Sequence, residues 1–269
     1  MTEGRHTRHR EEEPMKVGIV GKGGVGKTTV SALVAEAYAA RGRSVVAIDT
    51  DSNPNLGISL GLTLQQTEAI PTLPRSLLVG QGSRDVTAAA LIADYGRQTP
   101  AGPTLLTAMR VDQAGAGCTC GGHATVRSLL DEAIDGEADV TVIDMEAGLE
   151  HLSRSGGTLA YADLLLVVME PSRKSVLTAA RTITLAEELG IPRVYGVGNK
   201  ARLPGDAEFF ERTAAEFKVP LAGIIPYDPS VADADRAGMA VTAAPSEEVR
   251  AEIDRLVAFL DGVLAAPVP

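Results

Sequence analysis

The sequence predicts a single α/β domain with a mostly parallel β-sheet of about seven or eight strands and helices on both faces. Short apolar runs alternate with longer amphipathic stretches along the chain, which is typical of βαβ units. The apolar runs, such as Val45–Ile48 and Leu164–Met169, are continuous, which indicates strands buried on both faces. A sheet of this kind gathers the carboxyl ends of its strands at one edge, where ligands bind.

Residues 1–14 mix Arg, His and Glu without apolar periodicity and predict a flexible tail before one domain over residues 15–265. The expected strands are 16–20, 44–49, 104–109, 140–144, 164–169, 194–198 and 221–225. The expected helices are 28–41, 84–95, 124–135, 173–189, 206–217 and 246–264. No internal repeat or Pro-rich linker divides the chain, so one domain is the economical interpretation.

The composition excludes several functional classes. The chain has 269 residues and a net charge of −10, and only 3% of its residues are aromatic. Binding to nucleic acid relies on basic residues and on aromatic stacking, so this acidic chain is a poor candidate for it. No apolar stretch is long enough to cross a bilayer, and the N-terminus lacks the apolar core of a secretory signal. We expect a cytoplasmic protein without nucleic-acid or membrane partners.

A glycine-rich loop follows the first expected strand and precedes the first expected helix. Its pattern is G-x-x-x-x-G-K-[ST], whose glycines let backbone N–H groups surround a phosphate at a helix N-terminus. Lys27 is expected to reach the β- and γ-phosphates of a nucleotide, and the Thr28 hydroxyl to bind Mg²⁺. The residues assigned to the phosphate site are Gly21, Lys22, Gly23, Gly24, Val25, Gly26, Lys27, Thr28 and Thr29.

Carboxylates stand at the ends of two expected strands. Asp49 is the last residue of the second expected strand, and Asp51 follows two positions later. Asp144 is the last residue of the strand expected over 140–144. Such carboxylates lie beside the ligand crevice of a parallel sheet, so Asp49 and Asp144 are expected near Mg²⁺. The alternative for Asp144 is a helix N-cap.

Lys22 adds a second lysine to the loop. The run Lys22–Thr29 resembles the deviant P-loop of an ATPase family that includes nitrogenase iron protein, the MinD and ParA class of positioning ATPases, and metal-site maturation ATPases. The resemblance implies that Lys22 reaches the nucleotide of a second subunit in an ATP-promoted homodimer. It also implies that Asp51 is the switch I aspartate that orients the attacking water, and that Asp144 is of the Walker B type.

Three further stretches resemble one particular branch of this ATPase family. Residues 144–154, 167–173 and 198–200 are similar to the nickel-insertion accessory ATPases of carbon monoxide dehydrogenase, the CooC type. The likeness covers most of residues 15–265. Relatives usually have Pro directly after the second switch I aspartate, whereas Ser52 and Asn53 intervene here before Pro54. This departure bears on the geometry of switch I and on the rate of hydrolysis.

Two further strand ends are expected to frame the nucleotide base. Asn199 and Lys200 follow one strand, and Pro226 and Asp228 follow another. In the wider family such an Asn, and the segment after such a Pro, contact adenine, and an amide offers both a donor and an acceptor. The GTP-selective pattern Asn-Lys-x-Asp is incomplete because Arg202 stands where it requires Asp, which favours ATP. The alternative is that these are turn residues without a role in recognition.

The chain has two cysteines, Cys118 and Cys120, which are separated by a single residue in a Gly-rich loop. Thiolates suit Zn²⁺, Ni²⁺, Cu⁺ or an iron–sulfur centre, but one chain supplies only half of a tetrahedral set. A homodimer would supply four thiolates and bind one Ni²⁺ or Zn²⁺, and the motif is similar to the Cys-x-Cys of the nickel-insertion ATPases. His123 is a further ligand or a residue at a helix start. The alternative is a pair of buried thiols without metal.

Three functions follow from these features. The first is a Mg²⁺-dependent ATP hydrolase that acts as a metallochaperone for a client nickel enzyme, of the carbon monoxide dehydrogenase type. The second is a positioning or partition ATPase, although the acidic stretch 247–261 would be repelled by anionic lipid. The third is a reductase like the iron protein, whose bridging cluster takes ligands from two loops, whereas this chain has cysteine in one.

Overall fold

The computed structural model describes residues 14–73, 87–111, 137–145, 162–243 and 245–266. The strands are β1 (Met15–Gly21), β2 (Val45–Asp49), β3 (Arg97–Gln98), β4 (Thr104–Thr107), β5 (Val140–Asp144), β6 (Leu164–Met169), β7 (Val194–Ala201) and β8 (Leu221–Pro226). The helices are α1 (Lys27–Ala40), α2 (Leu56–Ser59), α3 (Leu64–Glu68), α4 (Ala88–Tyr95), α7 (Arg173–Glu188), α8 (Pro204–Glu216), α9 (Pro229–Arg236), the 3₁₀ turn η4 (Val241–Ala243) and α10 (Glu247–Leu264).

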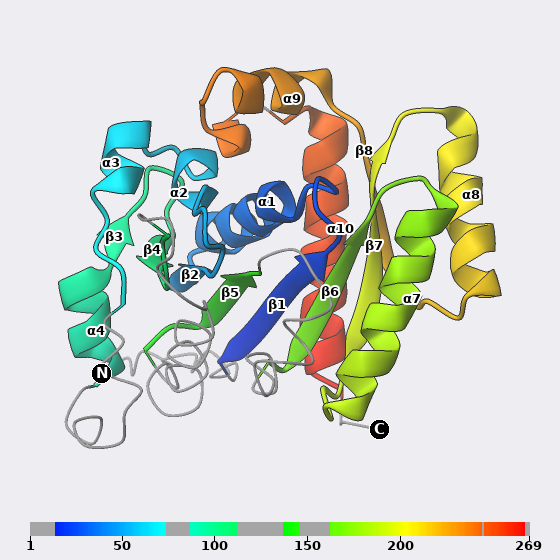
Figure 1. Cartoon of the computed structure of the whole chain (residues 1–269), viewed down its shortest axis with the longest axis horizontal. Helices are drawn as coiled ribbons and strands as arrows, with labels where there is room; N and C mark the ends of the chain where they lie inside the picture. Colours follow the sequence, from blue (N-terminus) through cyan, green and yellow to red (C-terminus); the bar gives the residue numbers. More distant parts are fainter. Residues whose placement is uncertain (1–13, 74–86, 112–136, 146–161, 244, 267–269) are drawn as a thin grey trace, which may run out of the picture.

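The strands form one eight-stranded sheet in the order β3-β4-β2-β5-β1-β6-β7-β8. Every neighbouring pair is parallel except the short β3–β4 pair. Helices α1 and α10 pack on one face of the sheet, and α7 and α8 pack on the other (Figure 1). The predicted fold class, the parallel sheet and the coverage of both faces are therefore confirmed.

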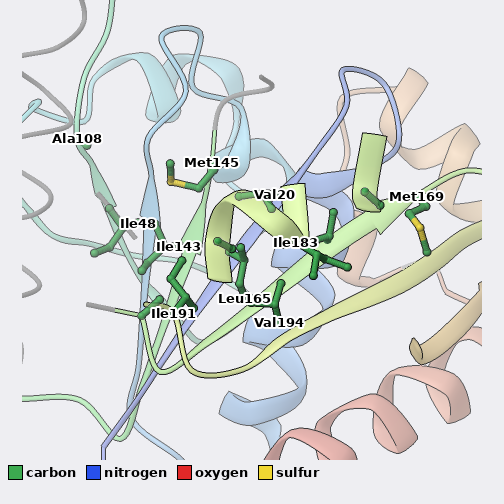
Figure 2. Packing of buried hydrophobic residues seen from close by; sticks show 14 of the residues in the cluster. Val20, Ile48, Ala108, Ile143, Met145, Leu165, Met169, Ile183, Ile191 and Val194 are labelled. Carbon is green, nitrogen blue, oxygen red and sulfur yellow. The ribbon is translucent and has the colours of Figure 1, made fainter. Parts of the chain in front are cut away.

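The sheet is buried on both faces because its central strands are apolar throughout. All six residues of β6 are buried. Leu165, Val167 and Met169 pack with α7 and α8, in the cluster that Figure 2 shows, whereas Leu164, Leu166 and Val168 pack with α1 and α10. Successive side chains of a strand point to opposite faces, so a continuous apolar run is what a doubly covered strand requires.

The expected strands all form, with shifted ends. β7 continues to Ala201, three residues beyond the prediction, and β4 ends at Thr107. Helix α9 was not predicted, although Asp228 before Pro229 is a helix-start signal that could have found it, since Asp caps the helix and Pro suits its first turn. The expected helix 124–135 and all but Pro14 of the expected tail lie outside the described residues.

Parallel order brings the carboxyl ends of the central strands to one edge. β1 ends there at Gly21, directly before the glycine-rich loop, and β2 and β5 end at Asp49 and Asp144. These two aspartates are partners in the β2–β5 register. The fold alone therefore places the loop and both carboxylates together. None of the helices in the described ranges is both long and apolar enough to cross a membrane.

Helix α8 holds β7 in place through one aromatic ring. Phe210 is fully buried, and a Cβ at Gly198 would lie only 2.9 Å from its ring atom Cδ2. The absence of a side chain at Gly198 lets the ring lie directly on the strand, immediately before Asn199.

We expect Phe210→Ala to lower the free energy of unfolding by about 3–5 kcal/mol, because it leaves a cavity against β7. Urea unfolding followed by circular dichroism measures the change. Phe209 is only half-buried, so Phe209→Ala is the matched control and should cost clearly less. Equal losses in the two variants would contradict the role given to Phe210.

Candidate functional site

The glycine-rich loop is built from backbone conformations that only glycine adopts easily. Gly24 and Gly26 have φ angles of 81° and 95°, and α1 begins directly afterwards at Lys27. A Cβ at Gly26 would lie 2.5 Å from Nδ2 of Asn199. The loop therefore approaches β7 as closely as backbone allows, and its turn ends at a helix N-terminus, which fits a phosphate group.

The two loop lysines lie in different environments. Lys27 is buried, with 8% of its surface exposed, and its Nζ lies 3.5 Å from the backbone oxygen of Lys22. Its charge also acts on Asp144, across the site. Lys22 is exposed. Lys27 thus lies buried inside the loop, whereas Lys22 is exposed at its surface.

Asp49 and Asp144 form a buried pair of carboxylates at neighbouring strand ends. Both oxygens of Asp49 accept backbone hydrogen bonds, from Asp51 N–H at 3.0 Å and from Leu56 N–H at 2.9 Å. Asp144 accepts hydrogen bonds from the hydroxyls of Ser31, at 2.9 Å, and Thr28. Both carboxylates are thereby oriented, and the hydroxyl of Thr28 lies beside Asp144.

Burial raises the pKa of both carboxyls. For Asp49, burial and then the neighbouring charge of Asp144 raise the pKa to about 7. For Asp144 burial also raises the pKa, and the hydrogen bonds and the charge of Lys27 only partly offset it. Two buried like charges favour either a shared proton or a bound cation. Carboxylates and a hydroxyl are oxygen ligands of the kind that Mg²⁺ takes, so these residues fit that ion.

The segment Thr50–Pro54 after β2, which the sequence predicts to be switch I, is hydrogen-bonded to the neighbouring strand ends. The N–H and hydroxyl of Thr50 both donate to the backbone oxygen of Asp144, at 3.0 and 2.8 Å. The carboxylate of Asp51 accepts the N–H of Asn53 at 2.8 Å, and Asp51 lines the cleft described below. The backbone oxygen of Ser52 accepts the N–H of Val111, four residues beyond β4, at 3.1 Å.

Asn199 and Lys200 hold the glycine-rich loop in this structure. Nδ2 of Asn199 donates to the backbone oxygen of Val25 at 2.8 Å, and Nζ of Lys200 donates to that of Gly24 at 2.6 Å. Lys200 also has a φ of 60°, a rare conformation for a residue with a side chain. From the sequence we expected these residues to lie beside the nucleotide base, and we did not predict their hydrogen bonds with the glycine-rich loop. Their role at the base stays a prediction.

The strand end at Pro226 leads into two helix caps. One carboxylate oxygen of Asp228 accepts the N–H of Ser230 at the start of α9, at 2.8 Å, and the other accepts the N–H of Ser246 before α10, at 2.6 Å. Burial opposes ionisation of Asp228, but these hydrogen bonds outweigh it and lower its pKa. Beside it, the Arg202 guanidinium lies 4.0 Å from the centre of the Tyr227 ring, in cation–π contact.

One cleft of about 880 Å³, a volume typical of small-molecule sites, lies beside the glycine-rich loop. Gly21, Lys22, Val25, Asp49 and Asp144 do not line it. The predicted site residues that line it are Gly23, Gly24, Gly26, Lys27, Thr28, Thr29, Asp51, Asn199, Lys200, Pro226 and Asp228. Residues that sequence reasoning did not assign also line it, among them Arg202, Tyr227 and Arg236. Most of the predicted site thus converges, with the phosphate loop at one end and β8–α9 at the other.

The predicted metal ligands of the cysteine loop cannot be placed in the same way. Cys118, Cys120 and His123 lie outside the described residues. Within the described part of the chain, no group of three or more His, Cys, Asp or Glu side chains is arranged to hold a metal ion.

The comparisons with known proteins agree with the cleft. Residues 19–241 match the family model described as the CobQ/CobB/MinD/ParA nucleotide binding domain. The carbon monoxide dehydrogenase accessory protein CooC of Rhodospirillum rubrum is 37% identical over 238 residues, which cover 84% of this chain and 88% of that protein. An iron–sulfur cluster carrier protein of Saccharolobus solfataricus is 29% identical over 83% of this chain and 74% of its own length.

A solved structure shows the same fold at lower identity. The septum site-determining protein MinD of Pyrococcus horikoshii, complexed with Mg-ADP, superposes with a TM-score of 0.70 and 20% identity. The superposition covers 93% of this chain and 97% of that chain.

The buried carboxylates give the apoprotein a characteristic pH dependence. Their folded-state pKa values lie above the ordinary value, so the folded state binds more protons than the unfolded state between about pH 4 and 7. In chelator and without nucleotide, the wild type therefore loses stability as the pH rises through this window. Asp144→Asn removes one charge, so we expect it to be more stable than the wild type at pH 8, with a gap that closes toward pH 4.

Urea unfolding over this pH range measures the gap. Asp139→Asn is the control, because hydrogen bonds from Ser44 lower the pKa of Asp139 and its removal should act in the opposite direction. Parallel stability curves for Asp144→Asn and the wild type would contradict the assignment.

Proposed function

Because this chain belongs to the CobQ/CobB/MinD/ParA nucleotide-binding family and is an ATPase, we propose that it works as an ATP-driven metallochaperone. Its client would be a nickel enzyme of the carbon monoxide dehydrogenase type, and its place of action the cytoplasm. The observation that supports this most directly is the similarity to CooC over most of both chains. The sequence of residues 144–154 and the Cys118–Cys120 pair, which resemble those of nickel-insertion ATPases, add to this support.

The cleft supports a division of roles among its residues. The backbone of Gly24–Gly26 and the buried Lys27 would hold the β- and γ-phosphates of ATP, and Thr28, Asp49 and Asp144 would hold Mg²⁺. When bound, Mg²⁺ neutralises charge on the phosphates. Asp51 lines the cleft from switch I and would orient the attacking water. Pro226, Asp228 and Asn199 would frame the adenine.

A homodimer would make the nucleotide a switch. Lys22 is exposed at the loop that binds phosphate, so its ammonium is free to reach the nucleotide of a second subunit. A cation beside the partner's γ-phosphate favours the dimer with ATP over the dimer with ADP, which supplies the differential affinity that a switch needs.

The cargo metal would bind Cys118 and Cys120 of both subunits as one Ni²⁺ or Zn²⁺ per dimer. The hydrogen bond between Ser52 and Val111 supports a link between this loop and the nucleotide. It fastens the backbone next to Asp51 to the chain that leads from β4 toward Cys118. Cys118 lies seven positions after Val111, and a fully extended chain of that length spans at most about 25 Å.

The similarity to an iron–sulfur cluster carrier favours one other candidate, in which the four cysteines of a dimer bind a cluster for delivery. Colour separates the two functions. A protein prepared without oxygen and loaded with iron and sulfide should show a broad visible band if it carries a cluster, whereas the Ni²⁺- or Zn²⁺-binding chaperone should keep no such band after desalting.

We expect Asp51→Asn to bind ATP nearly as well as the wild type and to lose hydrolysis, because Asp51 would orient water rather than hold nucleotide. Lys27→Ala should instead lose ATP binding. Titration of a fluorescent ATP analogue and phosphate release measure the two properties. Unchanged turnover in Asp51→Asn would remove Asp51 from the switch.

We expect Lys22→Ala to bind ATP as a monomer and to lose turnover, because the charge that reaches the partner's nucleotide is gone. Light scattering with a non-hydrolysable ATP analogue measures the mass. Lys16, at the opposite end of β1, gives the control variant Lys16→Ala, which should still dimerise. Full dimerisation of Lys22→Ala would contradict the role of Lys22.

We expect Cys118→Ala and Cys120→Ala each to abolish tight Ni²⁺ and Zn²⁺ binding while ATP binding persists. Metal affinity in the wild type should rise with pH, because thiolates must form, and it should rise with ATP by linkage. Anaerobic metal titration with and without nucleotide measures both. One metal per monomer, unaffected by either substitution, would place the ligands elsewhere.

A further inference from the structure

A second groove, of about 750 Å³, lies at the edge of the sheet where β8 is the last strand. Four successive residues of that strand, Leu221–Ile224, line it. The other lining residues include Glu211 of α8 and Glu252 of α10, helices that pack on opposite faces of the sheet. The groove therefore follows the edge of β8 itself. Figure 1 shows β8 between α8 and α10.

The outer edge of β8 is unpaired in the described part of the chain, and its residues Leu221–Ile224 carry no charge. The sequence Leu-Ala-Gly-Ile-Ile-Pro has no charged residue, and Leu221–Ile224 are all half-buried. A Cβ at Gly223 would meet nothing within 4 Å, so another backbone can approach there. Natural proteins usually protect such an edge with charges, a proline or a bulge. β8 has a register shift against β7 between Leu221 and Gly223 and ends at Pro226, but none of its residues is charged.

The walls of the groove select the charge of what binds. Glu211 stands on the α8 side, and Glu248 and Glu252 stand on the α10 side. Arg202 is the one basic residue of the lining, and its guanidinium already stacks on Tyr227. Exposed Leu203, at 68% exposure, adds apolar surface at the rim. The groove thus offers an apolar strand edge between acidic walls.

We propose that this groove docks an extended, basic segment of a partner protein, which adds to the sheet as a further strand beside β8. Main-chain hydrogen bonds to the open edge supply affinity, and Lys or Arg side chains of the segment pair with Glu211 and Glu248. A second copy of this chain is a poor occupant, because pairing two β8 edges would bring the acidic walls of both copies together. The charge of the walls therefore selects a basic partner.

Binding of a synthetic peptide tests the proposal. The probe is a fluorescein-labelled peptide that alternates Lys and Val over seven residues, measured by anisotropy against the full chain. We expect binding, with slower hydrogen exchange of the amides of Leu221–Ile224. A peptide with alternate amides N-methylated should lose binding, because its backbone can no longer pair with the strand. A peptide with Glu in place of Lys should not bind.

Charge reversal separates the groove from the general acidity of the protein. The double variant Glu211→Lys with Glu248→Lys should weaken binding of the Lys–Val peptide by about tenfold or more. Glu208→Lys with Glu247→Lys is the matched control, since it changes the same charge on the same two helices at residues that do not line the groove. It should weaken binding less than about twofold.

Three results would overturn the proposal. They are no binding to the wild type, an equal loss of affinity in the two double variants, and exchange protection that is absent from β8. ATP turnover of both double variants should stay at the wild-type level, because none of the four residues lines the nucleotide cleft.

Discussion

The site depends on two carboxylates that the fold forces together. β2 and β5 are neighbours in register, so Asp49 and Asp144 end opposite each other in a buried position. Two such charges oppose folding unless donors or a cation offset them. The surrounding structure supplies the donors from α1 and from the start of α2, through Ser31 and the N–H of Leu56. The negative charge that these donors leave uncompensated would favour a divalent cation beside the glycine-rich loop.

The phosphate loop depends on residues far from it in the sequence. Its carbonyls at Gly24 and Val25 accept hydrogen bonds from Lys200 and Asn199, so the loop conformation is fixed from β7. β7 is in turn held by the ring of Phe210 against Gly198. When the N–H groups of a loop point toward an anion, its carbonyls point away from that anion. The side chains of Asn199 and Lys200 donate hydrogen bonds to these carbonyls, which need partners where they are buried. The side chains of β7 therefore help to organise the glycine-rich loop.

The sequence was sufficient for the features that depend on local pattern. Continuous apolar runs predicted the strands, and Gly21–Thr28 predicted the phosphate loop, because both are set by neighbouring residues. The contacts of Asn199 and Lys200 with the loop were not predictable, since they depend on how close β7 comes to Gly26. The hydrogen bond from Ser246 to Asp228 was missed for the same reason, because the two residues are 18 positions apart in the sequence. The roles of Cys118, Cys120 and Lys22 stay predictions, because they depend on a second subunit.

The double cap at Asp228 also bears on the order in which a growing chain completes its site. A ribosome releases β1 and α1 early, and β7 later supplies the side chains that fix the phosphate loop. The Ser246 N–H reaches Asp228 only when α10, which follows every other described element, has emerged. α10 also packs on α1, where Asp261 accepts the hydroxyl of Tyr38 at 3.1 Å. During synthesis the β8–α9 end of the cleft therefore stays incomplete until α10 docks.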